Sequence, residues 1–236
     1  MRPVYLAGAA LLLFQAFGIF IPISVLGAAI DWPSSLGFPP DQVLPLIHAQ
    51  ESAVRLGYGV YLGWSLTFAA SAALIVGLAQ GERPISALAT LAIGLGVASA
   101  LARAIGIVRW LTGSNALADA YAAAPVGSTE RMAIETTQLA LNAYGGSVGE
   151  DLGVSALAAL WLVFAGAVIL RDKGLPTWLG WAAFPVAAVA PMPAADLVGL
   201  TSPVGVAVAT TAMQLWFAAA ATVLVSRGLK RSTAAV

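Results

Sequence analysis

Six long stretches with few or no charged residues limit what this chain can fold into more than any other feature. They cover about residues 4–30, 56–79, 85–111, 152–170, 178–195 and 204–226. A helix of about 20 apolar residues crosses the hydrocarbon core of a membrane. Because lipid offers no partner to backbone amides and carbonyls, each stretch must satisfy its own. The sequence therefore predicts an all-α fold, a polytopic integral membrane bundle of six transmembrane helices that forms one domain over residues 1–236.

Composition agrees with a membrane location and excludes several classes of function. Apolar residues make up 60% of the chain and charged residues 9%, whereas soluble domains carry about 25% charged residues. The 11 basic and 11 acidic residues balance, so no net field attracts nucleic acid. With no cysteine and one histidine, thiolate metal sites and paired haem ligands are excluded. We expect no metal, no cofactor and no nucleic acid partner, and membrane lipid as the surroundings.

The basic residues predict how the bundle lies in the membrane. With a cytoplasmic N-terminus, most of the Lys and Arg residues fall in the inner segments and fewer in the outer ones. This asymmetry favours both termini in the cytoplasm, at the inner (plasma) membrane. Two outer segments, about residues 41–52 and 128–142, are too polar to span. We interpret them as interfacial segments, with an outward extension of the second span as the alternative for the first and a lid over a cavity as the alternative for the second.

Charged residues gather near the outer ends of the spans. At 1.5 Å per helical residue, Arg103 lies about 27 Å above the start of its span, close to the roughly 30 Å thickness of the hydrocarbon. The same count brings Asp151 and Asp196 to that level. Glu51 and Arg55 enter it from the second helix. We therefore predict a charged ring at the outer mouth of the bundle.

Two pairs within this ring also have structural explanations. Glu51 and Arg55 are spaced i, i+4 on one helix, which suits a surface ion pair. Ser147 and Glu150 fit the S-x-x-E capping box at the start of the fourth span, which would satisfy the first amides of that helix. Neither the ion pair nor the capping box requires a bound ligand.

Arg103 is the hardest of the charged residues to place on the surface. Apolar residues flank it on both sides, so it must reach the headgroups or pair inside the bundle. Asp151 and Glu51 are the leading partners, whereas Arg109, on another face, is interpreted as a headgroup contact. Small residues at every fourth position allow the third and fourth spans to touch and would bring Asp151 near Arg103; they are Ala98, Ala102 and Gly106, and Gly145, Gly149 and Gly153.

Aromatic residues complete the candidate site. They can line a cavity or belong to the aromatic belts of a membrane protein; they are Tyr58, Tyr61, Trp64, Trp110, Tyr144 and Trp161. The chain has no P-loop, G-x-S-x-G, H-E-x-x-H or dinucleotide motif. No predicted span holds a lysine for a retinal Schiff base.

Three segments resemble a known family. They are ESAVRLGY at 51–58, the Ala-Arg-Ala at 102–104, and LNAYGGSVGEDLG at 141–153 followed by the turn RDKGLPTWLG. Over about residues 5–200 the chain resembles a bacterial six-helix membrane family catalogued as domain of unknown function 4386. The resemblance implies that the charged cluster belongs to the family pattern, and it implies no reaction. The matching positions are Glu51, Arg55, Arg103, Asp151, Gly153, Leu175, Pro176 and Gly180, whereas the long alanine-rich outer segment and the tandem Glu150-Asp151 depart from it.

The leading hypothesis is an outward-opening, aromatic-lined pocket with a charged rim that handles a small hydrophobic or lipid-like molecule. If the pocket catalyses, Asp151 or Glu150 donates a proton, Arg103 sets the ionisation of the carboxyl group, and aromatic faces stabilise positive charge. That combination fits a cyclase or isomerase of the acid-base type acting on an isoprenoid-like substrate. The residues expected to bind the ligand are Glu51, Arg55, Tyr58, Tyr61, Trp64, Trp110, Tyr144 and Asp196.

Two other classes of function stay open. A small-molecule transporter or permease is suggested by a possible repeat of two helical hairpins and by a fifth span interrupted at Pro185, Pro191 and Pro193, since transporters often bind substrate at broken helices. A non-catalytic membrane subunit would use the charged rim to dock a partner.

Overall fold

The computed structural model describes residues 2–202 and 204–233, and the regular structure in that part of the chain is entirely helical. Six helical stretches in it are long and apolar enough to cross a membrane, which confirms the predicted all-α bundle. The protein is therefore a multi-pass membrane protein. The six stretches are Val4–Ile30, Glu51–Gln80, Ala87–Ala123, Thr129–Asp172, Thr177–Ala195 and Val208–Leu229.

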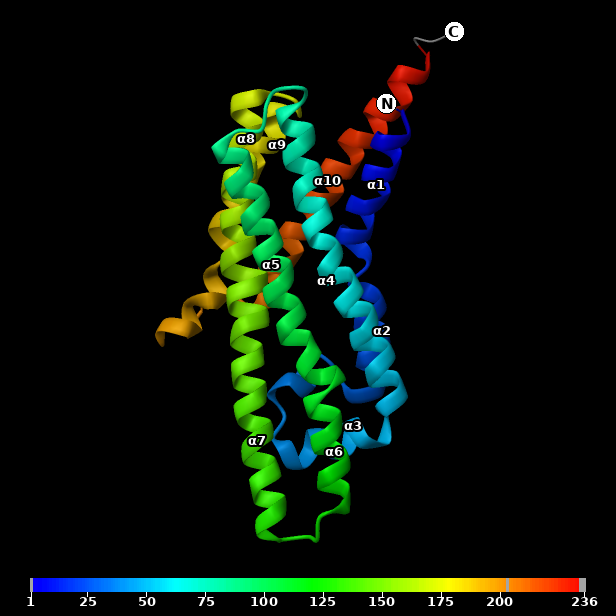
Figure 1. Ribbon diagram of the computed structural model, residues 1–236, viewed down its shortest axis with the longest axis vertical. Coiled ribbons are helices and arrows are strands. Elements are labelled where there is room, and N and C mark those ends of the chain that lie inside the picture. The colour runs from blue at the N-terminus through cyan, green and yellow to red at the C-terminus, as the bar shows by residue number, and fades with distance from the viewer. Residues whose placement is uncertain (1, 203, 234–236) are drawn as a thin grey trace.

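One end of the bundle, here called the turn end, holds the turns of two helical hairpins (Figure 1). Short turns there join α4 (Glu51–Gln80) to α5 (Ala87–Leu111) and α8 (Ala158–Asp172) to α9 (Thr177–Val189). The Asp172 carboxylate fastens the two hairpins together, because it accepts hydrogen bonds from Arg83 (3.0 Å) and from Arg171 (2.6 Å). The first turn of α1 (Arg2–Phe17) and the last turns of α10 (Val206–Thr233) also lie at the turn end.

The first span is broken in its middle, where the sequence predicts one continuous helix. α1 ends at Phe17 and α2 (Phe20–Ile30) begins three residues later. A Cβ on Gly18 would lie 2.7 Å from Trp64 Cδ1, so only glycine lets the chain pass this close to the ring. Trp64 Nε1 donates to the Phe14 carbonyl (3.0 Å), and Gln15 Nε2 donates to the Trp64 carbonyl (2.9 Å). This exchange ties the break to α4.

The opposite end, here called the loop end, extends well beyond the spans. α7 (Thr129–Gly146) continues without interruption through η2 (Ser147–Leu157), a π-helix, into α8. At 1.5 Å per residue the 44 residues of this stretch measure about 66 Å, roughly twice the hydrocarbon thickness. Residues 129–142 are therefore continuous with the helix of the fourth span, which they extend at the loop end. α6 (Gly113–Ala123) prolongs α5 beside it.

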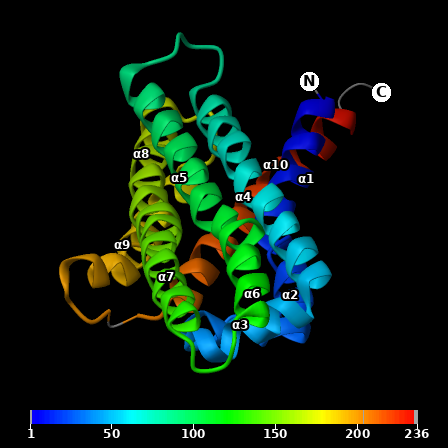
Figure 2. The same cartoon turned by 60° about the horizontal axis from the view of Figure 1, so that its bottom comes forward.

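α3 (Pro40–Ala49) lies across the loop end, between α2, α6 and α7 (Figure 2). The chain leaves helical geometry at Gln50 (φ −120°, ψ 26°), so this segment is not a straight extension of the second span. Its buried residues Val43, Leu44 and Ile47 pack into the apolar core at this end of the bundle. The loop end is thus covered by an amphipathic helix.

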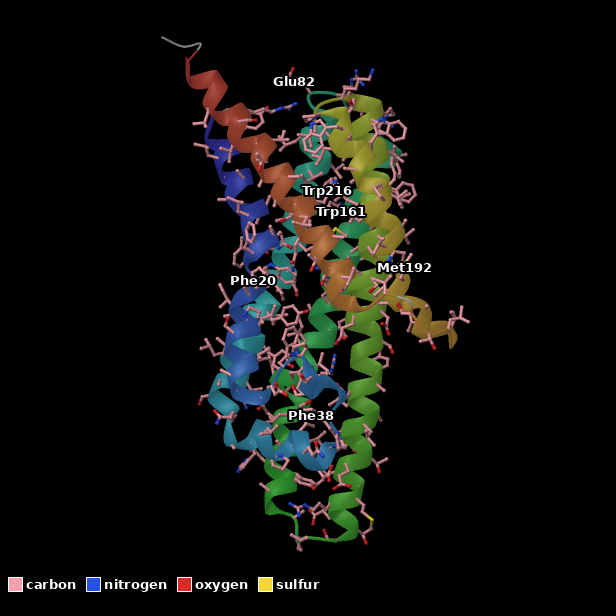
Figure 3. All side chains as sticks on the ribbon, turned by 180° about the vertical axis from the view of Figure 1, so that it is seen from behind. Phe20, Phe38, Glu82, Trp161, Met192 and Trp216 are labelled. Carbon is pink, nitrogen blue, oxygen red and sulfur yellow. The ribbon has the colours of Figure 1, made fainter. Side chains whose placement is uncertain are left out.

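Two separate apolar cores stabilise the bundle. The turn-end core is built around Phe68 and Trp161, which α4 and α8 supply. The loop-end core holds Leu44 and Ile47 of α3 with Trp110 of α5. Figure 3 shows Trp161 and Trp216 side by side in the turn-end half of the molecule. The functional candidates lie between the two cores.

α5 and η2 touch through their backbones, which confirms the approach predicted from the small-residue spacing. A Cβ on Gly106 would lie 2.6 Å from Gly149 Cα, and a Cβ on Gly153 would lie 2.9 Å from the backbone nitrogen of Arg103. In membranes such contacts are driven by close packing, since lipid tails are as apolar as the side chains.

Gly106→Ala is expected to lower the free energy of unfolding by about 1–3 kcal/mol, because the added methyl group forces α5 away from η2. Gly94→Ala is the matched control on the same helix, since a Cβ there meets nothing within 4 Å and alanine favours the helix. Thermal unfolding of both variants in detergent checks this. An equal midpoint for the two variants would contradict the close contact.

Candidate functional site

A cavity of about 360 Å³ lies between the two cores. α2, α4, α5, η2 and α10 all contribute to its wall. Its aromatic lining consists of Phe20, Trp32, Tyr58, Tyr61, Trp64 and Trp110, and its charged lining consists of Arg103, Arg109 and Glu150. The cavity thus combines ring faces with a small number of charged groups, as ligand pockets generally do.

The aromatic side chains are held by one another. Tyr58 and Trp110 stack in parallel with ring centroids 5.0 Å apart and an interplanar angle of 3°. Tyr61 contacts Trp32 edge-on at 5.9 Å and Trp64 at 5.7 Å. Such pairs stabilise each other beyond their buried area, so these five rings support one another along the cavity wall.

Arg103 lies at the end of the cavity nearest the turn-end core, and only 5% of it is exposed. Its guanidinium carbon is 4.1 Å from the centroid of the Phe68 ring and 5.9 Å from that of Trp64. Among the described residues no carboxylate lies within ion-pair distance of it. The predicted pairing with Asp151 or Glu51 is therefore wrong: Glu51 is held by another arginine on its own helix. Ring faces stabilise the cation instead.

Arg109 is also inside the bundle, and its interpretation as a headgroup contact is wrong. Its side chain is 6% exposed, and Nη2 lies 3.5 Å from Glu150 Oε1. Nη1 donates to the Gly106 carbonyl (2.8 Å). A Cβ on Gly145 would overlap the Arg109 side chain, so this glycine makes the room for it. The carboxylate and the carbonyl oxygen together stabilise this buried guanidinium.

Glu150 and Asp151 lie on η2 and not at a helix start. The capping box predicted for Ser147 and Glu150 is wrong, because the helix runs through this segment and leaves no free first amides. A π-helix turns more slowly than an α-helix, and such insertions are frequent at functional sites. In η2 it places Glu150 on the cavity wall, whereas Asp151 lines a neighbouring space.

That neighbouring space is a polar hollow of about 430 Å³. Asn142, Ser147, Asp151 and Ser202 line it, and it shares Arg109 and Glu150 with the cavity. At the other end, a space of about 30 Å³ adjoins Arg103 and is lined by polar residues that the sequence analysis missed, namely Gln15, Ser155, Thr210 and Gln214. Glutamine in a transmembrane helix is the signal that could have found two of them.

The remaining predicted residues lie elsewhere. Glu51 and Arg55 form an exposed pair (2.7 Å), as their spacing predicts, and Arg55 also donates to the Leu111 carbonyl (3.1 Å). Tyr144 is exposed and Trp161 belongs to the turn-end core. The side chain of Asp196 lies outside the described residues.

The family model for the domain of unknown function DUF4386 matches residues 6–227. The chain belongs to the DUF4386 family. The match includes every residue that lines the cavity, so this arrangement of α2, α4, α5, η2 and α10 is to be sought in other DUF4386 proteins. No curated protein and no solved structure matches the chain significantly.

Proposed function

We propose that this DUF4386 protein binds a small hydrophobic or lipid-like molecule in the cavity between its two cores. The observation that carries the proposal is the cavity itself, about 360 Å³ in volume and walled by stacked aromatic rings beside buried charged groups. Its volume falls in the range of roughly 300–1,000 Å³ that ligand pockets occupy. A space of this size in the middle of a packed bundle costs stability unless something fills it.

The ligand enters from the membrane. Phe20 of α2 and Thr211 of α10 line the cavity and are themselves exposed. Figure 3 shows Phe20 beside the break in the first span. The neighbouring polar hollow, which shares Arg109 and Glu150 with the cavity, suits water, whereas the side of Phe20 and Thr211 suits a molecule dissolved in lipid. We place the turn end, with Arg83, Arg171 and Arg227, on the cytoplasmic side.

Binding fits the site better than the alternatives do. A carbocation-forming cyclase needs aromatic faces free to stabilise positive charge, but Arg103 already occupies the faces of Phe68 and Trp64 and would repel a second cation. A permeation route is opposed by the turn-end core, in which Phe68 and Trp161 pack edge to face below the cavity.

The proposal is tested by filling the cavity with a larger side chain and measuring whether a bound compound is lost. Ile23 lines the cavity, whereas Ile21 on the same helix is exposed and does not. We expect mass spectrometry of solvent extracts to find one hydrophobic compound in stoichiometric amount in the wild type and in Ile21→Trp, and at least a tenfold loss in Ile23→Trp. Only bulk lipid, in equal amounts from all three proteins, would overturn the proposal.

A further inference from the structure

We infer that the ligand is a single-chain amphiphile with a carboxylate head, and that Arg103 binds this carboxylate. The inference rests on the proposed function and names its ligand class. Arg103 is a buried cation, and its ring contacts with Phe68 and Trp64 provide no acceptors for its N–H groups.

The Arg103 guanidinium has unused hydrogen-bonding capacity. A guanidinium carries five N–H donors in its plane, and in the described part of the chain none of those of Arg103 has an acceptor; Nε is buried and without a partner. Its described contacts are with the rings of Phe68 and Trp64, which stabilise the positive charge but offer no oxygen acceptor to the N–H groups. Arg103 lines both the large cavity and the small space beside it.

Charge selects the head group. The cavity wall holds two guanidinium groups, Arg103 and Arg109, and one carboxylate, Glu150, which leaves an excess of one positive charge. A carboxylate balances that charge and matches the planar fork of arginine with two parallel hydrogen bonds. A phosphate monoester brings a charge of about −1.5 to −2, more than the wall can balance.

Shape selects the rest of the molecule. Apart from its charged residues and a few polar side chains of α10, the lining is mostly apolar or aromatic, and Ile23, Trp64 and Ile107 belong to it. The cavity reaches the surface beside Phe20, so a hydrocarbon chain can extend from it into lipid. One chain suits a space of about 360 Å³. Water is the competing partner for Arg103, because the adjoining space of about 30 Å³ is large enough for a single molecule.

The experiment compares an acid with an alcohol of the same chain. Dibromo-octadecanoate and dibromo-octadecanol quench tryptophan fluorescence on contact, and Trp32, Trp64 and Trp110 line the cavity. Binding is titrated at about pH 8, well above the pKa of a carboxyl group, in wild type, Arg103→Gln and Arg103→Lys. Arg55→Gln is the matched control, since Arg55 is exposed. Acetate is added as a competitor without a chain.

We expect the wild type and Arg55→Gln to bind the acid at least tenfold more tightly than the alcohol. Arg103→Gln should weaken the acid about 10–100-fold, the usual cost of a charge-assisted hydrogen bond, and leave the alcohol unchanged, which also shows that the variant is folded. Arg103→Lys should be intermediate because it keeps the charge but loses the fork.

Other results overturn the inference in distinguishable ways. If wild type binds the acid and the alcohol with equal affinity, Arg103 binds water and not the carboxylate. The cavity is then a purely hydrophobic site. Displacement of the acid by acetate means that a free small anion is bound. Absence of saturable quenching by either probe overturns the proposed function as well.

Discussion

Trp161→Ala is expected to lower the free energy of unfolding by about 2–4 kcal/mol. The Trp161 ring is fully buried and packs against Phe68 (5.1 Å), Phe217 (5.7 Å) and Trp216 (5.8 Å). In soluble proteins Trp→Ala in a core costs about 3–5 kcal/mol. Part of that cost is transfer out of water, which is smaller here because lipid is also apolar. The cavity left among three rings accounts for the rest.

Trp181→Ala is the matched control, because Trp181 is exposed and faces away from the core. Thermal unfolding midpoints of both variants, in one detergent at one protein concentration, measure the difference. We expect a change within about 0.5 kcal/mol for Trp181→Ala. Equal loss in the two variants would mean that the turn-end core does not hold the bundle together.

The fold could be predicted from the sequence wherever one physical effect dominates. Uncharged stretches near 20 residues leave no alternative to a transmembrane helix, so the six spans are recovered. The break at Gly18 was not predicted, because it depends on the close approach of Trp64, a residue far away in the sequence. The continuous length of the α7–η2–α8 helix was not predicted either, because its sequence points to an interruption that the structure does not have. A glycine-rich segment at 145–153 suggests a helix start, but close packing on α5 holds it helical.

The candidate site, like the fold, could be predicted from the sequence only in part. Of the six aromatic residues named as candidates, Tyr58, Tyr61, Trp64 and Trp110 line one cavity, whereas Tyr144 and Trp161 do not. The height of a residue along a helix does not say in which direction around the helix axis its side chain points. A π-helix changes that direction further. The exposed position of Tyr144 and the separation of Asp151 from Arg103 follow from that rotation.

Glu150→Gln is expected to destabilise the protein by about 2–3 kcal/mol, because it leaves Arg109 buried without its carboxylate. Breaking a fully buried pair by removing one partner costs roughly 3–5 kcal/mol. The Glu150 side chain is 36% exposed, and Arg109 keeps its hydrogen bond to the Gly106 carbonyl. Both facts reduce the loss. Glu51→Gln is the matched control, since its pair with Arg55 is exposed and such pairs contribute about 0–1 kcal/mol.

The double variant Arg109→Met, Glu150→Gln separates the charge from the packing. Removing both charges leaves no uncompensated ion in the bundle, and an apolar chain of similar length keeps the contact with Gly145. We therefore expect the double variant to recover at least about 1 kcal/mol relative to Glu150→Gln alone. Chemical denaturation of wild type, both single variants and the double variant gives the coupling energy. Additive losses would show that Glu150 does not compensate Arg109, and the excess positive charge of the cavity wall would then not belong to Arg103 alone.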